Sequence, residues 1–257
     1  MGLPFDISYV FSFIPKLAET LLLTLGIVAG SLLSGLLFGL IAALPRLYRV
    51  PVLEQISMAY ASFFRGTPIL IQLFLIYYGL PELIKAMHID VTRTPVLVFV
   101  ILTYGLHTGA FVSETIRAAI MAVDRGQVEA AYSLGMTGPQ AFRRIAAPQA
   151  LAIAVPVLAN LTLGLLKETS LAFTLGVMEM SGKAQSLARV TLHFLEAYLA
   201  LALIYLAVAF ILEKLLLAAE HRLLRHERPE SAAGQFRLLR GITLRKLASG
   251  MQGGASS

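Results

Sequence analysis

The amino-acid sequence predicts an all-α membrane protein whose helices cross the bilayer about five times. Apolar residues make up 57% of its 257 residues and charged residues only 14%, roughly half the usual charged share. Mean hydropathy is +0.76. The 26 residues from Thr20 to Pro45 contain no Asp, Glu, Lys or Arg, which exceeds the ~20 residues that cross a hydrocarbon core. These observations exclude an ordinary soluble domain.

Division of the chain at its charged residues predicts where the helices cross the bilayer. One segment is interrupted by Arg65-Gly66-Thr67-Pro68, so we expect a helix at the membrane surface followed by a short apolar run from Ile69 to Leu80. The last segment has 16 residues and rises only about 24 Å, so we expect its flanks, Glu213 and Lys214 included, to extend it. The predicted spans are Leu21–Leu44, Gln55–Leu80, Pro95–Ile116, Ile145–Leu166 and Ala197–Leu212.

The distribution of Lys and Arg between alternate loops predicts the orientation. With five spans, one side of the membrane holds the N-terminus, residues 81–94 and residues 167–196, which carry six Lys or Arg against seven Asp or Glu. The other side holds the remaining 15 of the 21 Lys and Arg. Because cytoplasmic loops are enriched in positive residues, we expect the N-terminus outside the cell and the C-terminus in the cytoplasm.

The two terminal segments have alternative interpretations. Residues 1–44 place a Lys before an apolar run, as a signal peptide does. We favour a retained membrane helix, because the run is about twice as long as an ordinary signal-peptide core and no small-residue cleavage site follows it. Residues 227–257 lose the apolar pattern and end in Gly, Ala and Ser, which predicts a basic, disordered cytoplasmic tail whose positive charges are solvated or touch anionic lipid.

The cytoplasmic segment at about 121–148, between the third and fourth spans, predicts two short helices that meet at a glycine. Residues Gln127–Leu134 are good helix formers, and Gly135 suits the left-handed conformation that ends a helix. Thr137, Pro139 and Gln140 then have the pattern of a capping box at the start of a second helix.

The first of these helices carries small and apolar residues that suit a contact surface. Ala130 and Ala131 would let another backbone approach closely, and Tyr132, Leu134 and Met136 offer apolar contact. Composition alone favours two interpretations equally: docking on a soluble partner, or packing on the chain's own helix bundle.

This loop resembles the EAA loop of ABC-importer permeases. Glu-Ala-Ala is followed at the family's spacing by Gly, Ile and Pro, with Ala147 where the usual pattern has Leu. The resemblance implies a coupling helix that sits in a groove of a cytoplasmic ATP-binding subunit. The residues that carry it are Glu129, Ala130, Ala131, Gly135, Ile145 and Pro148.

Further motifs resemble permeases for polar amino acids of the histidine, glutamine or arginine type, in the family's order and over most of residues 17–226. They are Phe64-Arg65-Gly66-Thr67-Pro68 followed by Gln72-Leu73-Phe74 and Tyr77-Tyr78-Gly79-Leu80-Pro81, then Gly109-Ala110-Phe111 with Glu114 and Arg117, and Lys167-Glu168-Thr169-Ser170-Leu171. Two departures limit the inference: His107 stands where the family commonly has Asn, and Glu168 replaces Asp. The solute class therefore follows from the resemblance, whereas the individual solute does not.

The resemblance implies an assembly in the bacterial inner membrane. Residues 1–226 would form a type I ABC-importer transmembrane domain. Its expected partners are two cytoplasmic ATP-binding subunits, a second permease subunit that is identical or related, an extracytoplasmic solute-binding protein and membrane lipid. No nucleic-acid partner is expected.

The chain carries no nucleotide-binding loop of the form G-x-x-x-x-G-K-[ST]. The nearest segment, Gly176–Ala184, has five residues between its glycines and ends in Ala184, which has no hydroxyl for Mg²⁺. We therefore expect no catalytic residue, metal or cofactor in this chain, with ATP and Mg²⁺ bound by the partner ATPase.

Three residues of the third span are candidates for contact with the solute. Glu114 is the one carboxylate within the predicted spans, where ionisable groups are usually functional. It would attract an ammonium group or, as we favour, pair with Arg117 three residues along the helix. His107 lies seven residues before Glu114 and shares its face; with Thr108 it would line a cavity or form an interhelical hydrogen bond.

Three more candidates follow the proline-containing fourth span. At Lys167, Glu168 and Thr169 a broken helix would leave backbone groups free for a carboxylate or an ammonium. A salt bridge on the outer surface is the alternative interpretation.

Two other classes of function are less consistent with the sequence. An ion-gradient-driven transporter or channel predicts more intramembrane carboxylates than Glu114 and often a repeat between the two halves, which we do not see. A membrane-embedded enzyme would need paired acids, a histidine metal site or a Ser/His/Asp set within the spans. The sequence therefore favours the ATP-driven importer.

Overall fold

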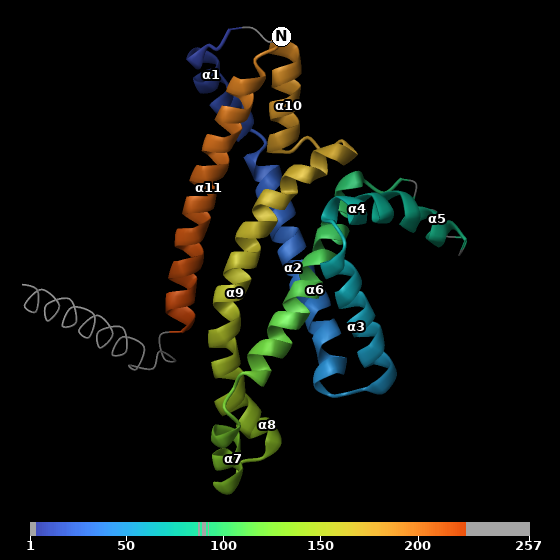
Figure 1. Ribbon diagram of the computed structural model, residues 1–257, viewed down its shortest axis with the longest axis vertical. Coiled ribbons are helices and arrows are strands. Elements are labelled where there is room, and N and C mark those ends of the chain that lie inside the picture. The colour runs from blue at the N-terminus through green and yellow to red at the C-terminus, as the bar shows by residue number, and fades with distance from the viewer. Residues whose placement is uncertain (1–3, 87, 89–90, 92, 225–257) are drawn as a thin grey trace, which may run out of the picture.

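The computed structural model describes residues 4–86, 88, 91 and 93–224, and these residues form helices joined by short turns (Figure 1). The predicted basic tail, residues 227–257, lies outside the described residues. In chain order the elements are α1 (Ile7–Ala18), α2 (Leu21–Leu47), α3 (Pro51–Gly66), α4 (Ile69–Phe74), the π-helical turn η1 (Leu75–Gly79), α5 (Leu80–Lys85), α6 (Val96–Met121), α7 (Arg125–Ser133), α8 (Gly138–Ala141), the π-helical turn η2 (Phe142–Ala146), α9 (Ala147–Glu168), the 3₁₀ helix η3 (Thr169–Leu175), α10 (Met180–Thr191) and α11 (Phe194–Leu223).

The helices confirm a polytopic α-helical bundle. Within the described residues, four helices are long and apolar enough to cross a membrane, or five if one bent pair counts as a single span. The four continuous helices, Leu21–Leu47, Val96–Met121, Gly138–Leu175 and Phe194–Leu223, are each longer than the predicted span, because helical structure continues past the charged ends. Glu213 and Lys214 accordingly lie inside α11, as expected from its short apolar run.

Glycines bring α2 and α6 into close contact. Gly35 and Gly39 of α2 face α6, and Gly105 and Gly109 of α6 face α2, which gives one GxxxG pair on each helix. A Cβ at Gly35 would lie 2.8 Å from Thr108 Cβ, well inside ordinary contact distance. Small residues allow such approach between membrane helices, where apolar burial favours association less than it does in water. The two helices therefore form a tightly packed, parallel pair.

The second predicted span is a bent pair of helices whose first member, α3, runs along the side of the bundle (Figure 1). α3 packs on both α2 and α6. The Tyr60 hydroxyl donates to the Leu106 carbonyl oxygen at 2.6 Å, near the middle of α6. A helix lying flat on the membrane could not reach that level, so the prediction of a surface helix for this segment is wrong.

After Gly66 the chain bends by 115° into the segment Ile69–Lys85. The bend interrupts the helical hydrogen bonds, and the buried side chain of Gln72 replaces two of them. Its Nε2 donates to the carbonyl oxygens of Phe64, at 2.8 Å, and Thr67, at 2.9 Å. Gln72 thus supplies hydrogen bonds to backbone carbonyl groups that the bend at Pro68 leaves without helical partners.

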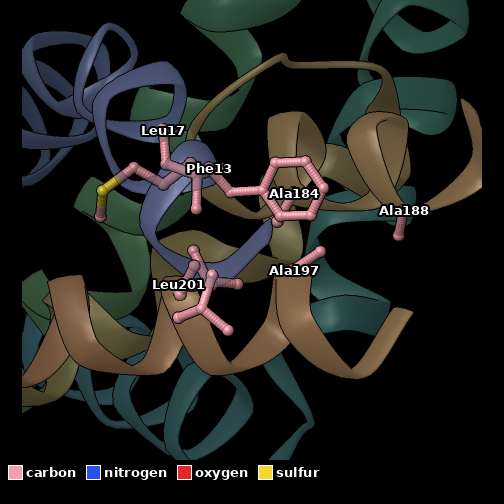
Figure 2. Packing of buried hydrophobic residues seen from close by; sticks show 9 residues of the cluster. Phe13, Leu17, Ala184, Ala188, Ala197 and Leu201 are labelled. Atoms are coloured by element: carbon pink, nitrogen blue, oxygen red, sulfur yellow. The ribbon is translucent and has the colours of Figure 1, made fainter. Parts of the chain in front are cut away.

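A helix that the sequence analysis does not predict, α1, packs at the end of the bundle opposite α7 (Figure 1). Figure 2 shows its apolar side chains against small residues of α10 and α11, which let the three helices approach closely. The signal for α1 is the recurrence of Val10, Phe13 and Leu17 at helical spacing. The labelled residues of this cluster are Phe13, Leu17, Ala184, Ala188, Ala197 and Leu201.

Buried polar contacts hold this end together. The Asp6 amide donates to Glu196 Oε1 at 2.8 Å, and His193 Nδ1 lies 3.0 Å from the same oxygen. Glu179, which is fully buried, accepts a hydrogen bond from the Gly182 amide at 2.9 Å and caps α10. Burial raises the pKa of the Glu179 carboxyl above its ordinary value.

Candidate functional site

The sequence predicts two helices that meet at Gly135, and this bend, called here the elbow, is present where α7 and α8 project from the end of the bundle (Figure 1). α7 begins at the Asp124 cap, whose Oδ1 accepts from the Gly126 amide at 2.8 Å. It ends before Gly135, whose φ of +81° lies in the left-handed region that favours glycine. The amide of Met136 then returns to the Ala131 carbonyl oxygen at 3.1 Å. This closes the end of α7 as expected for a left-handed helix terminus.

The second arm of the elbow differs from the prediction of a separate short helix. Gln140 Oε1 accepts from the Thr137 amide at 2.9 Å, and Pro139 lies in the first turn, so the predicted cap is present. The helix then continues through η2 into α9, giving one 38-residue helix from Gly138 to Leu175. No helix-ending residue separates the arm from the predicted fourth span. The elbow therefore joins α7 directly to a membrane-crossing helix.

The outer face of α7 presents both charge and apolar surface. Glu129 and Ala130 are exposed, as are Tyr132 (52%) and Leu134 (81%). Ala131 is only 3% exposed, so just one of the two alanines is available to a partner, contrary to expectation. Tyr132 and Leu134 are thus available to a docking partner, whereas Ala131 is covered by residues of this chain.

The inner face of α7 is attached to both neighbouring membrane helices. Three residues, 122–124, separate it from α6. Gln149 Nε2 of α9 donates to Gln127 Oε1 of α7 at 2.6 Å. Val128 of α7 packs on a buried cluster from α6 and α9 and the turns beside them, Ala119, Val123, Ala146, Ala150 and Ala154. Ile145 and Pro148, the last two residues of the EAA pattern, are partly buried in the same region. A displacement of α7 would therefore reach α6 and α9 together.

Glu114 is held in a cluster of arginines. Arg46 Nη1 of α2 lies 2.7 Å from Glu114 Oε2, Arg117 also bonds the carboxylate, and Arg65 Nη1 is 3.7 Å away. The pairing with Arg117 that we favour from the sequence is thus present. Arg46 is an additional partner that sequence spacing could not indicate, because the two residues lie 68 positions apart. The cluster connects α2, α3 and α6.

His107 takes part in an interhelical hydrogen bond. Its side chain is buried, and its Nδ1 lies 2.9 Å from Gln72 Oε1, which accepts from the tautomer protonated at Nδ1. Thr108 is 1% exposed and packs on Gly35. Of the two interpretations from the sequence, the geometry matches the interhelical contact, and Gln72 is the partner that sequence reasoning missed.

The three residues after the fourth span point in different directions. Lys167 is exposed, whereas Thr169 is fully buried and its hydroxyl donates to the Leu166 carbonyl oxygen at 2.7 Å. The Glu168 carbonyl oxygen accepts from the Tyr104 hydroxyl at 2.8 Å. The Thr169 amide donates to the Leu165 carbonyl oxygen as the helix narrows into η3, so the expected free backbone groups are absent at this amide.

The alternative interpretation, an outer salt bridge at Lys167 or Glu168, is not present either. Across residues 4–86 and 93–224, neither side chain lies within ion-pair distance of an opposite charge.

Known proteins match this chain over most of its length. The family described as binding-protein-dependent transport system inner membrane component matches residues 35–225. The L-cystine transport system permease protein TcyL of Bacillus subtilis (strain 168) is 45% identical over 87% of this chain and 93% of its own. The glutamine transport system permease protein GlnP of Escherichia coli (strain K12) is 30% identical over 85% and 98%, respectively.

A solved structure has the same fold. The crystal structure of an amino acid ABC transporter with histidines aligns with 86% of this chain and 100% of its own chain, at a TM-score of 0.76 and 32% identity. These proteins support the ATP-driven interpretation and not the gradient-driven alternative. A bundle with an exposed glycine elbow at one end, matched in sequence and fold to such permeases, leaves one conclusion: the chain belongs to the family of binding-protein-dependent transport system inner membrane components, the permease subunits of ABC importers.

Proposed function

We propose that this chain forms part of the transmembrane pathway of an amino-acid importer and that α7 is the helix through which a separate ATPase drives it. The observation that carries the proposal is the elbow at Gly135, which presents Tyr132 and Leu134 to solvent while the inner face of α7 is joined to α6 and α9. ATP and Mg²⁺ would be bound by the ATPase, since this chain offers no loop for them.

The attachments of α7 explain how motion would pass into the membrane. Closure of two ATPase subunits on ATP would displace the docked α7. Because residues 122–124 and the Gln127–Gln149 hydrogen bond connect α7 to α6 and α9, both helices would tilt with it. Such a tilt would open the pathway to each side of the membrane in turn.

The proposed orientation has α7 in the cytoplasm and the N-terminus outside. Arginines near the α7 end, including Arg46, Arg49, Arg125, Arg143 and Arg144, support it. The solute-binding protein would then deliver its solute at the opposite end, where α1, α10 and η3 lie (Figure 1).

A second permease subunit would complete the pathway against α9. Asn160 is exposed near the middle of this helix, and Lys167, two turns later on the same face, is exposed as well. A polar side chain at that depth needs a protein or water-filled surround rather than lipid. We therefore propose that this face lies toward a second copy or a related subunit.

The amino-acid solute is proposed from the relatives and from the retained motifs. His107, Thr108, Glu114 and Thr169 make packing or hydrogen-bonding contacts within this chain and would shape the pathway indirectly. The half-buried Glu168 and the exposed Lys167 are the two candidates whose side chains could meet a solute carrying both ammonium and carboxylate groups.

Uptake and ATP hydrolysis, measured together, test the coupling role. The chain is reconstituted in proteoliposomes with its ATPase and binding protein. Gly135→Val forces a β-branched residue into a left-handed position, so we expect normal insertion, retained ATP hydrolysis and loss of most uptake. Gly135→Asn, which tolerates that conformation, is the matched control and should retain most uptake.

A charge reversal on the outer face of α7 gives an independent check. Glu129 is exposed and in no ion pair within the described part of the chain, so Glu129→Lys should leave the fold intact while it weakens docking. Normal uptake in both Gly135→Val and Glu129→Lys would contradict the coupling role of α7.

A further inference from the structure

An arginine-rich pocket lies between the α2–α3 turn and the start of α7. Its volume is about 490 Å³, within the range of about 300–1,000 Å³ usual for ligand sites. None of the EAA residues lines it. Its walls are Arg46, Leu47, Arg49, Glu54, Met58, Arg117, Met121 and Arg125.

The charge of this pocket is poorly balanced. Arg46 and Arg117 are already bonded to Glu114. Arg49 and Arg125 are exposed, and in the described portion of the chain neither forms an ion pair, although Glu54 lies in the same wall. Two uncompensated guanidinium groups on one cavity match an anion that offers several acceptor oxygens, such as a phosphate group.

The backbone at Arg49 is held in an unusual conformation. Its φ is +54°, a left-handed value that glycine adopts without steric cost and that arginine rarely adopts. Arg49 follows the last residues of α2, and the amide of Val50 donates to the Pro45 carbonyl oxygen at 3.0 Å, so the left-handed residue closes the C-terminus of this helix. At this corner of the α2–α3 turn, the strained residue supplies one of the two unpaired positive charges.

The position and the walls of the pocket favour a lipid over a free ion. The α2–α3 turn lies at the ends of the membrane-crossing helices, while α7 and α8 project farther out (Figure 1). The exposed ring of Tyr48 precedes Arg49, and α3 begins with the exposed side chains of Val52, Leu53 and Ile56, which suit the boundary between headgroups and hydrocarbon. Leu47, Met58 and Met121 add apolar surface inside the pocket, which a bare phosphate ion would leave uncovered.

We propose that this pocket binds the phosphate headgroup of an anionic phospholipid, with Arg49 and Arg125 as its main charged contacts. That the lipid belongs to the cytoplasmic leaflet rests on the proposed orientation; the binding itself does not. Because the α2–α3 turn and the first residue of α7 both contribute arginines, a bound headgroup would bridge the bundle to the base of the coupling helix.

Native mass spectrometry of the full chain in detergent micelles tests the proposal. Phosphatidylglycerol, phosphatidylcholine and inorganic phosphate are titrated separately, and bound species are counted. We expect phosphatidylglycerol to be retained at concentrations where phosphatidylcholine is not. Arg49→Gln should weaken phosphatidylglycerol binding about fivefold, the effect of removing one positive charge near an anionic lipid. Arg222→Gln, the same charge change at an exposed position in the last turn of α11, should weaken it less than twofold.

A second variant separates ligand binding from folding. Arg49→Gly relieves the left-handed strain, so it should keep or raise the midpoint of thermal unfolding while it loses phosphatidylglycerol affinity as Arg49→Gln does. Equal binding by wild type and Arg49→Gly, or equal loss in Arg49→Gln and Arg222→Gln, would overturn the proposal. Binding of inorganic phosphate that depends on Arg49, without retention of phosphatidylglycerol, would overturn the lipid as the ligand.

Discussion

The close contact between α2 and α6 predicts that a single added methyl group at Gly39 destabilises the bundle. A Cβ built at Gly39 lies 2.5 Å from Val112 Cβ and 3.0 Å from the Gly109 carbonyl oxygen. Carbon atoms pack best at about 3.5–4.0 Å, so the helices would have to separate by about 1 Å. Overpacking of this kind usually costs about 1–3 kcal/mol, and we expect Gly39→Ala to lower the free energy of unfolding by that amount.

The same helix supplies the matched control. A Cβ at Gly26 meets no other atom within 4 Å. Gly26→Ala should therefore leave stability unchanged or raise it by up to about 1 kcal/mol, because alanine loses less backbone entropy than glycine in a helix. Both variants carry the same chemical change at positions 13 residues apart on α2.

Unfolding by sodium dodecyl sulfate in mixed micelles, followed by far-ultraviolet circular dichroism, measures this difference. Val112→Ala removes the Cγ methyl groups on the facing side and should recover part of the loss when combined with Gly39→Ala. The packing argument is refuted if Gly39→Ala and Gly26→Ala unfold at the same detergent fraction.

Two further predictions concern charged groups. Glu114→Gln removes the counter-charge of Arg46 and Arg117 and should lower the free energy of unfolding by about 1–3 kcal/mol. The control is Glu82→Gln, at an exposed position in no ion pair within the described residues, which should change that free energy by less than about 0.5 kcal/mol in the same assay. Burial raises the pKa of the Glu179 carboxyl above 4.5. Between pH 4.5 and the folded-state pKa, this carboxyl is therefore protonated in the folded state and ionised in the unfolded state. The free energy of unfolding of the wild type should fall as pH rises through this window. Glu179→Gln should flatten that fall in unfolding measured from pH 4.5 to 8; an unchanged slope would contradict the assignment.

Local signals in the sequence predicted the features that local interactions determine. The left-handed Gly135, the cap at Thr137 and the apolar run of α2 each depend on a few neighbouring residues, and all three are present. Helix α1 has a similar signal in its apolar spacing, but its 12 residues are too few to cross a bilayer, so the pattern that predicts membrane spans does not indicate it.

The contacts that determine the candidate site join segments far apart in the chain, and for that reason the sequence did not indicate them. Gln72 reaches His107 because the chain bends by 115° after α3, and Arg46 reaches Glu114 because the glycines align α2 with α6. The GxxxG pairs are visible in the sequence, but which helix faces which requires the fold. The same holds for the arginine pocket, whose walls come from four segments.

The distribution of tight and loose contacts indicates which helices would move together. The glycine contact and the Arg46–Glu114 pair fasten α2 to α6 at two levels, so these helices should behave as one body. By contrast, α6 and α9 are joined by an apolar cluster near α7 and by the Tyr104–Glu168 hydrogen bond at the other end, and α9 has one face exposed. A displacement of α7 would then tilt the α2–α6 pair as a unit and turn α9 against it, because within the described residues no ion pair joins α9 to α6. The elbow at Gly135 lies between the two bodies, since α7 follows α6 and the chain beyond Gly138 leads into α9. Loss of the left-handed conformation at that one residue should therefore uncouple ATP hydrolysis from movement without loosening either body.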